Sequence, residues 1–423
     1  MILGGAALQR CGIRIVLNAA LAAEGIVLAC ERVFSQSVEA WQEAFVSPRY
    51  NSEKLMDSSL KDGSLTGAIP EVSIIVPARN EEASLGDCLE SLTQTGVAFE
   101  IIVVDDGSID RTHEIAQTFA KVRVISAGPL RDGWTGKNNA VIAGAKEARA
   151  QWLLFTDADT VHLPGSLARA LAEAKREGAD LLSYSPEQMA VTFAERAVMP
   201  VIFAELATQY PPQKVRDRNS GIVAANGQYI LVRRAAYDAV GGHAAVATEI
   251  LEDVALARLF DNAGKRVYFR YGGDAVRTRM YRNWPQLREG WTKNLALLFP
   301  HPERLAVQSL LLWFAVWSML SVAVSGAVIH HLAWIAFAAL WALAYRRIRV
   351  AHFSPANNLI AIACGLPTFA YLLLRSKNAH AIGQVSWKGR AYGTAAPSGS
   401  TLTKVQADKS IPRVENQKLR TEN

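Results

Sequence analysis

The sequence lacks the glycine-rich loops by which dehydrogenases and P-loop enzymes bind nucleotide phosphates. The sequence therefore shows neither the usual signature of hydride transfer nor that of ATP hydrolysis. The 4 cysteines are scattered and show no metal-ligand spacing. We expect no disulfide framework, which fits a cytoplasmic catalytic domain. The soluble part has no basic stripe interleaved with aromatic residues, so the net charge of +6 favours a membrane surface and diphosphates over nucleic acid as partners.

Charged residues are also missing from two long stretches of the C-terminal part. Residues 305–345 and 350–374 contain no Asp, Glu, Lys or Arg. Because a membrane helix needs about 20 apolar residues, the first stretch predicts two helices hinged near His330 and His331. The second stretch predicts one more.

The basic loop between these stretches sets the expected orientation. It contains Arg346, Arg347 and Arg349, and basic loops stay in the cytoplasm. Two crossings after a cytoplasmic catalytic domain bring the loop back to that side. A third full crossing would export Lys388 and Arg390, so the second stretch either crosses, re-enters or lies at the interface. We predict a multi-pass protein of the cell membrane with a cytoplasmic catalytic domain.

The expected organisation has four parts. They are an N-terminal membrane anchor and linker (1–70), a catalytic domain (71–300), transmembrane helices (301–376) and a cytoplasmic or disordered tail (377–423). The proposed anchor, residues 13–30, is long enough to span but is interrupted by Arg14, Asn18 and Glu24. It is an anchor, an interfacial helix or a packed helix of the core, and no convincing signal-peptide cleavage site is present.

The catalytic part alternates short apolar runs with helical patterns. We predict strands at residues 72–76, 100–104, 122–125, 152–156 and 180–184, with helices at 81–92, 110–119, 138–149 and 163–177. Such alternation gives right-handed crossovers and a mainly parallel sheet. Ligands of these sheets bind beyond the carboxyl ends of the strands.

Two acidic pairs lie at predicted strand ends. Asp157 and Asp159 follow one buried strand, and Asp105 and Asp106 end another. In extended chain, residues two apart point the same way, so Asp157 and Asp159 can face one site. Their oxygens suit Mg²⁺ or Mn²⁺, which in turn binds a diphosphate. A single acidic strand end is also explained by a turn or a helix cap, but two within one sheet favour a site.

Two loops before predicted helices carry polar residues that could contact a donor. Residues 77–82 follow the first strand, and a loop that opens a helix offers free backbone N–H groups to a ligand. The alternative is an ordinary turn with Asn80 near the helix cap. Lys137 ends a glycine-bracketed turn, where it either touches a phosphate or is a solvated lysine. Asp106 can accept hydrogen bonds from a base or ribose, while Ser108 or Asp110 would cap the next helix.

Glu252 and Asp253 follow a glycine-containing loop. A general base must be a carboxylate or imidazole close to the hydroxyl that it deprotonates. Two acids that open a helix also complement its dipole, which is the simpler explanation. His243, in the preceding loop, is more typical of a structural residue.

A basic and aromatic cluster precedes the first uncharged stretch. It comprises Arg277, Arg279, Arg282, Trp284 and Trp291. Arginine donors match the oxygens of a diphosphate. The same composition is typical of a belt at a membrane interface.

These motifs, in this order, resemble the inverting glycosyltransferases of family 2, over roughly residues 72–298. The matching stretches are 77–81, 105–108, 157–159 and 252–253. Residues 133–137, 279–281, 289–293 and 387–390 narrow the resemblance to a membrane-bound branch that includes carotenoid-acid (diaponeurosporenoate) glucosyltransferases and hopanoid-associated enzymes. Related ceramide and processive enzymes carry Gln or Arg, then two residues, then Arg-Trp. This sequence departs from that pattern, because Arg279-Met280-Tyr281-Arg282 is followed by Asn283 before Trp284. The assignment of an arginine to the leaving group is therefore open, and a processive polymerase is disfavoured.

The resemblance implies an α/β GT-A nucleotide-diphospho-sugar transferase fold with C-terminal transmembrane helices. It implies a catalytic base, a set of donor-binding residues and two metal ligands. The base would be Asp253, the donor would contact Pro77, Arg79, Glu81, Asp106, Lys137, Asp157 and Arg279, and Asp157 with Asp159 would bind Mg²⁺ or Mn²⁺. Residues 226–228 would line the acceptor side.

The expected activity is inverting transfer of a hexose from a nucleotide sugar such as UDP-glucose to a lipophilic acceptor. A polyprenyl-phosphate sugar transferase would use the same donor site. A sugar-1-phosphate nucleotidyltransferase shares the sheet type, but its glycine-rich basic first loop is absent. A non-catalytic membrane scaffold could keep the fold, although retention of all four acidic motifs disfavours it.

Overall fold

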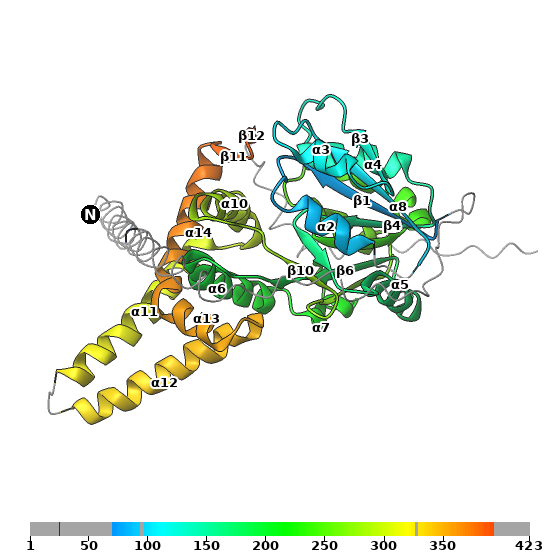
Figure 1. Ribbon diagram of the computed structural model, residues 1–423. Coiled ribbons are helices and arrows are strands. Elements are labelled where there is room, and N and C mark those ends of the chain that lie inside the picture. Colours follow the sequence, from blue (N-terminus) through cyan, green and yellow to red (C-terminus); the bar gives the residue numbers. More distant parts are fainter. Residues whose placement is uncertain (1–24, 26–69, 94–96, 326–328, 393–423) are drawn as a thin grey trace, which may run out of the picture.

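The computed structural model describes Gly25 and residues 70–93, 97–325 and 329–392. The predicted anchor over residues 13–30, apart from Gly25, and the tail from residue 393 lie outside the described residues. Figure 1 shows an α/β half built on a sheet and a helical half from which two helices project away from the sheet.

A mixed sheet forms the centre of the α/β half, in the order β3-β2-β1-β4-β8-β6-β9. Its strands are β1 (Val72–Ala78), β2 (Phe99–Asp105), β3 (Val122–Ser126), β4 (Trp152–Thr156), β6 (Leu181–Ser185), β8 (Tyr229–Arg233) and β9 (Val267–Tyr271). The predicted strands all run in one direction, which confirms a mainly parallel sheet. β8, which was not predicted, runs antiparallel between β4 and β6.

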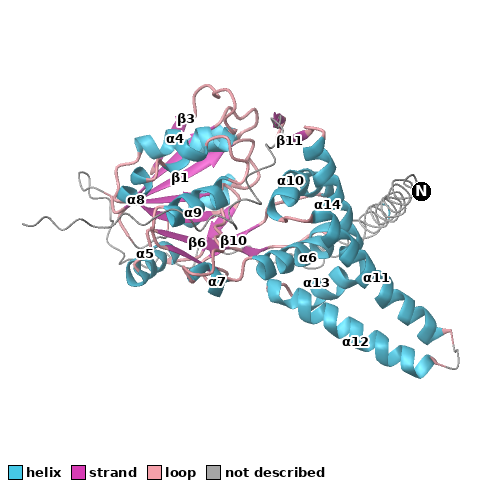
Figure 2. Cartoon of the chain, turned by 180° about the vertical axis from the view of Figure 1, so that it is seen from behind, coloured by secondary structure: helices cyan, strands magenta, loops and turns pink. Residues whose placement is uncertain are grey.

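Helices cover both faces of the sheet (Figure 2). They are α2 (Leu85–Leu92), α3 (Thr112–Gln117), α4 (Gly136–Glu147), α5 (Ser166–Glu177), α8 (Arg234–Ala239) and α9 (Glu252–Asn262). Ile74 packs with α2 and α5, whereas its neighbour Ile75 packs with α4 and α9. Because both faces are covered, the strands are nearly continuous apolar runs rather than alternating ones.

The first two helices begin later than predicted, because the loops before them are tied to each other. The backbone N–H of Asn80 donates to Ser108 Oγ at 3.1 Å, and Asn80 Oδ1 accepts from the N–H of Ile109 at 3.0 Å. The prediction of Asn80 near a helix cap is wrong, since Ser84 is the N-cap residue of α2. Asn80 instead joins two strand-end loops.

Several short elements connect the two halves. A three-stranded sheet contains β5 (Thr160–His162), β10 (Val276–Thr278) and β7 (Glu187–Gln188). The 3₁₀ helix η2 (Gly242–Val246) precedes α9, and α7 (Pro212–Arg216) follows α6.

The helical half contains α6 (Phe193–Gln209), α10 (Trp284–Leu298), α11 (Pro302–Val324), α12 (His330–Ile348), η3 (Arg349–Ala351), α13 (Pro355–Ile360), η4 (Ala361–Gly365) and α14 (Leu366–Ala381). The first uncharged stretch forms α11 and α12, and the second helix begins at His330, as expected. A hairpin of β11 (Val385–Trp387) and β12 (Arg390–Tyr392) follows α14.

Within the part of the chain that the structure describes, two segments are long and apolar enough to cross a membrane, Pro302–Val324 and Pro355–Ala381. In the first, 22% of the apolar window is buried inside the protein, against 67% in the second. The hairpin of α11 and α12 exposes large apolar side chains, among them Leu311, Leu332 and Ile335. These features are weak evidence for membrane association, and they do not by themselves support the expected multi-pass topology.

The end of α14 lies beside the α/β half. After this helix, Lys388 and Arg390 form ion pairs with Glu81 and Asp106. A full third crossing would place Lys388 and Arg390 on the opposite side of a membrane from the sheet. These contacts therefore exclude that arrangement.

Candidate active site

A cavity of about 1230 Å³ opens where the carboxyl ends of β1, β2 and β4 face α6, α9 and α10. It is larger than the roughly 300–1,000 Å³ of a typical single-ligand cleft, so it has room for two substrates. Every site residue expected from the sequence lines it, namely Pro77, Arg79, Glu81, Asp106, Lys137, Asp157, Asp159, Asp253 and Arg279. Parallel strands end at one edge of a sheet, which brings motifs from distant parts of the chain together.

The two acids at the end of β2 have different surroundings. Asp105 Oδ1 accepts the N–H of Ser108 at 3.0 Å and holds the turn. Asp106 instead lines the cavity. Arg79 is aimed at the same loop, since its Nη1 donates to the backbone oxygens of Asp106 and Gly107 at 2.5 and 3.2 Å. The cavity wall at this edge thus includes the Asp106 carboxylate and the Arg79 guanidinium.

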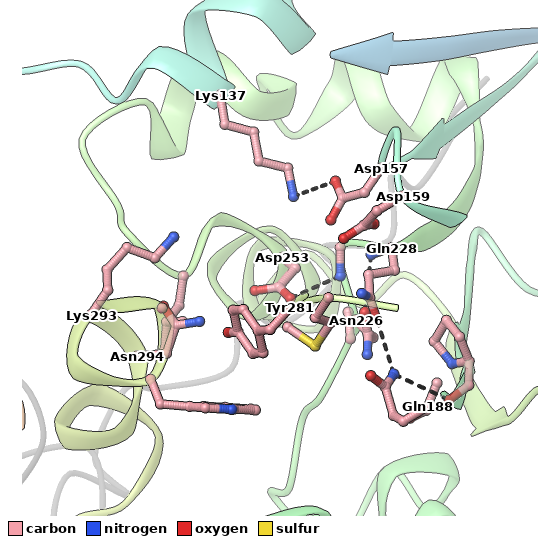
Figure 3. A pocket seen from close by; sticks show the side chains of 18 of the residues that line it. Lys137, Asp157, Asp159, Gln188, Asn226, Gln228, Asp253, Tyr281, Lys293 and Asn294 are labelled. Carbon is pink, nitrogen blue, oxygen red and sulfur yellow. Dashed lines mark hydrogen bonds and ion pairs between the residues drawn. The ribbon is translucent and has the colours of Figure 1, made fainter. Parts of the chain in front are cut away.

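Asp157 and Asp159 share one wall of the cavity, as Figure 3 shows. They do so through a turn at Ala158 and Asp159, so the expectation of extended chain is wrong. Asp159 Oδ1 is buried and has no hydrogen-bond partner among the described residues. Burial and the charges of Asp157 and Glu81 raise the pKa of Asp159 to about 8. An unpaired buried carboxylate oxygen beside a second carboxylate fits a cation.

Lys137 is held between two acids, so the alternative of a solvated turn lysine is wrong. Its Nζ lies 2.7 Å from Asp157 Oδ1 and 2.8 Å from Glu252 Oε1. Although burial lowers its pKa, the charges of Asp157 and Glu252 raise it well above the ordinary value. Thr135 fixes the start of α4, because its side chain accepts the N–H of Asn138.

Asp253 lies in the first turn of α9 and is held by backbone groups. Its Oδ2 accepts the N–H of Gly227 at 2.9 Å, and its Oδ1 accepts the N–H of Val254 at 2.8 Å. Burial and the charge of Glu252 raise the pKa of Asp253 to about 6, which is a useful value for a general base near neutral pH. A Cβ at Gly227 would lie 3.0 Å from Lys137 Nζ, so only glycine fits without displacement.

Arg279 lines the cavity but is tied to the helical half. Its Nε and Nη2 each lie 3.3 Å from the carboxylate of Glu195. Glu195 also accepts the N–H of Thr192 at 2.7 Å in the capping box of α6. The Arg279–Glu195 pair therefore fixes the start of α6.

The rest of the basic and aromatic cluster does not act as a unit. Arg277 pairs with Glu187 at 2.7 Å, outside the residues that line the cavity. Trp284 and Trp291 are each only 2% exposed, in the core of the helical half. The interpretation of these two tryptophans as a belt at a membrane interface is therefore wrong.

The hairpin after α14 is part of the site. From the sequence alone, these residues were expected to belong to a tail. Lys388 Nζ donates to Glu81 and, at 3.0 Å, to the backbone oxygen of Arg79. Both terminal nitrogens of Arg390 contact the carboxylate of Asp106, Nη2 at 3.0 Å. The Trp-Lys-Gly-Arg run was a usable signal, but nothing local showed that it returns to the sheet.

Gln188 and Lys293 also line the cavity and were not predicted, whereas Gln228 belongs to the stretch 226–228 expected on the acceptor side. Gln188 Nε2 donates to Gln228 Oε1 at 3.3 Å, and Gln228 donates to Thr278 Oγ1 at 3.1 Å. This amide chain forms part of the cavity wall. Lys293 enters the cavity from α10. His243, in contrast, is buried against Tyr237 and is absent from the cavity lining.

Residues 73–241 match the family model described as Glycosyl transferase family 2. These residues form a family 2 glycosyltransferase domain. The resemblance inferred from the motifs is thereby confirmed for these residues, which make the protein an enzyme of the glycosyltransferase class.

The chain is also similar to individual glycosyltransferases. The chain is 27% identical over 338 residues to 4,4'-diaponeurosporenoate glycosyltransferase of Staphylococcus aureus (strain USA300), across 76% of this chain and 88% of that protein. The mannosyltransferase PcManGT of Pyrobaculum calidifontis, solved with GDP-Man and Mn²⁺, is 13% identical over 86% of this chain and 98% of its own, with a TM-score of 0.39. Glucosyl-3-phosphoglycerate synthase of Mycobacterium tuberculosis, solved with Mn²⁺ and UDP, is 20% identical over 54% and 77%, with a TM-score of 0.38.

The described residues contain no group of three or more His, Cys, Asp or Glu side chains arranged to hold a metal ion. A cation at Asp157 and Asp159 would therefore need ligands from a bound donor. Diphosphate oxygens are suitable partners, since Mg²⁺ is commonly bound by one or two carboxylates together with substrate phosphates.

Proposed function

We propose that this glycosyltransferase moves a hexose from a nucleoside-diphosphate donor, such as UDP-glucose, to a lipophilic acceptor with inversion at the anomeric carbon. The observation that carries the proposal is one cavity that holds Asp106, Asp157, Asp159 and Asp253 together. No single element of the fold supplies more than two of them.

The donor would lie along the ends of β1, β2 and β4. Pro77, Arg79, Glu81 and Asp106 would surround the nucleoside, and Lys137 would face the diphosphate. Asp157 and Asp159 would hold a divalent ion, which when bound neutralises charge on the diphosphate.

The acceptor would approach from the helical half. On the helical side the cavity is lined by Phe203, Leu206, Tyr210, Val350 and His352, the last two just after the end of α12. These mainly apolar and aromatic side chains suit an apolar acceptor. A relative named for a diaponeurosporenoate acceptor supports the same class of acceptor.

The chain's own groups then perform the transfer by position and proton removal. Asp253 removes the proton of an acceptor hydroxyl, whose oxygen attacks the anomeric carbon from the face opposite the nucleotide. An ionised carboxylic acid needs no deprotonation, and Asp253 would then orient it. The cavity walls hold both reactants close, which lowers the entropic part of the barrier.

The proposed organisation places this domain (71–300) in the cytoplasm, with membrane contact through the exposed faces of α11 and α12. Arg347, at the end of α12, pairs with Glu205 of α6 at 2.7 Å. The basic end of the projecting hairpin is therefore fixed to the catalytic side, in agreement with the rule for basic loops.

Incubation of membranes containing the full chain with labelled nucleotide sugars and Mn²⁺, followed by mass analysis of the extracted lipids, tests the proposal. We expect a labelled lipid together with release of nucleoside diphosphate. A labelled polyprenyl phosphate would indicate the alternative acceptor, and pyrophosphate would indicate a nucleotidyltransferase. Failure to turn over any donor would contradict the proposal and favour a scaffold.

The rate is expected to depend on pH through Asp253. Burial raises its pKa to about 6 in the folded protein, so the base is protonated below this pH and ionised above it. With an alcohol acceptor, kcat/KM should rise roughly tenfold per pH unit below about 6 and level off above it. The measurement is a pH profile of nucleoside diphosphate release, and a flat profile between pH 4.5 and 6 would contradict the assignment.

Arg390→Met is expected to weaken nucleotide binding about tenfold, or roughly 1.4 kcal/mol. The substitution leaves the carboxylate of Asp106, only 7% exposed, without its cation. Monophosphate and diphosphate nucleotides should lose affinity equally, because Asp106 is assigned to the nucleoside. The matched control is Lys377→Met on α14, which breaks an exposed ion pair with Glu303 of α11. Unchanged affinity of Arg390→Met would separate the hairpin from donor binding.

A further inference from the structure

Lys293 is a charged group of the cavity that the proposed reaction has not used. The cavity is lined by three lysines among the described residues, and Lys137 and Lys388 each form ion pairs with acids. The ammonium of Lys293 has no carboxylate within 4 Å in the described part of the chain. Lys293 makes a cation–π contact with the ring of Trp387, whose centroid lies 5.5 Å from Nζ.

Arg279, which the resemblance places at the donor, is engaged elsewhere. Arg279 is bound by Glu195, whose side chain is only 2% exposed. Removal of one partner from such a pair leaves a buried charge without compensation. Glu195 is also needed for the capping box of α6. Arg279 therefore cannot move toward negative charge that develops on a substrate without leaving Glu195 unpaired.

Lys293 faces the groups assigned to the diphosphate across the same cavity. Burial lowers the pKa of Lys293, although the charges of Glu252, Asp157 and Asp253 act in the opposite direction. Figure 3 shows Lys293 reaching into the cavity from the side opposite Asp157 and Asp159. Trp387 also contacts Lys388, whose Nζ lies 5.9 Å from the same ring, so one aromatic ring supports both lysines.

We propose that Lys293 is the catalytic cation that receives the leaving nucleoside diphosphate, in place of Arg279. This assignment rests on the proposed function. In the transfer, the bond from the anomeric carbon to the diphosphate oxygen breaks with its electron pair on that oxygen. The bond to the acceptor oxygen forms, and the acceptor proton passes to Asp253. Lys293 remains an ammonium throughout and donates a hydrogen bond to the diphosphate.

The fixed acids of the site explain why a further cation is needed. Lys137 balances Asp157 and Glu252 before any donor binds. A diphosphate that gains charge on leaving therefore meets a cavity wall whose other lysines are already paired. Lys293 is the lysine of this wall free to respond, and Coulomb attraction is strengthened where water is excluded.

The test compares nucleotide binding by the full chain in detergent, measured by calorimetry with Mn²⁺ present. Lys293→Met should weaken UDP or GDP binding at least tenfold, while the matching monophosphate changes less than threefold. It should also lower kcat more than it raises the KM of the donor. Lys293→Arg should recover most of the diphosphate affinity, because it restores the charge. Lys175→Met, at an exposed position on α5, is the control for loss of one positive charge.

Selective loss of diphosphate affinity, with recovery in Lys293→Arg, supports the assignment. Equal losses for diphosphates and monophosphates would overturn it, since a structural role predicts that result, and so would unchanged diphosphate affinity. If the wild-type chain binds no nucleoside diphosphate at all, the proposed function itself fails. If it binds one and Lys293→Met binds it equally well, only the role of Lys293 fails.

Discussion

Replacement of Asp253 by asparagine is expected to lower kcat about 10²–10⁴-fold with an alcohol acceptor, the usual contribution of a general base. Asparagine has nearly the same shape, and its carbonyl oxygen can still accept the N–H of Gly227. It cannot take up the acceptor proton. Donor binding should stay within about threefold of wild type, because Asp253 is not assigned to the donor. Single-turnover rates and nucleotide titrations measure the two effects separately.

Asp238→Asn is the matched control for Asp253→Asn. Asp238 is an acid on α8 whose side chain is 62% exposed, so the substitution removes one negative charge away from the cavity. Its kcat should equal that of wild type. If Asp253→Asn retains a rate within tenfold of wild type on an alcohol, the base is another group. The pH profile of the variant should also lack the rise near pH 6.

Asp159→Asn is expected to remove most of the Mn²⁺-dependent rate. The buried Oδ1 of Asp159 has no hydrogen-bond donor among the described residues, so the substitution removes a carboxylate ligand for the ion without breaking a hydrogen bond of that atom. Loss of charge stabilisation from a divalent ion is worth several kcal/mol, and roughly 3 kcal/mol corresponds to about a hundredfold lower rate. Titration of Mn²⁺ followed by paramagnetic resonance measures binding independently of activity.

Chelation provides the second arm of the Asp159 experiment. Wild-type enzyme treated with a chelator should regain activity when Mn²⁺ is added, whereas Asp159→Asn should not. Glu90→Gln, at an exposed position of α2 outside the cavity lining, serves as a comparison. If Asp159→Asn binds Mn²⁺ in the presence of nucleoside diphosphate as tightly as wild type, Asp159 is not a ligand. A wild type indifferent to chelation would exclude the metal from the reaction.

The α/β half could largely be predicted from the sequence. Runs such as residues 152–156 are apolar because both faces of the sheet are covered, and burial of this kind is visible in a single strand. The acids follow these runs directly, so their position at one sheet edge was also predictable. β8 (Tyr229–Arg233) was missed because it runs antiparallel to both neighbours, outside the alternation of parallel strands and crossover helices.

The partners of the cavity residues could not be predicted. The sequence allowed Lys137 to touch a phosphate or to be solvated, and it gave no sign of its partner Glu252, far along the chain. Arg279 looked free to bind a diphosphate, but the start of α6 supplies Glu195 as its partner. Ion pairs of this kind depend on distances between separate elements, and no local periodicity encodes those distances.

The sequence by itself determined the order of the acidic motifs along the chain, the resemblance to a glycosyltransferase family and the positions of the apolar helices. Only the tertiary structure decided that the chain after α14 returns to the sheet, where Lys388 and Arg390 meet Glu81 and Asp106. Hydrophobic patterning is a property of each segment, because burial acts on each side chain separately. The closure of the site is a property of packing, because a charge finds its partner only after the helices around it have been placed.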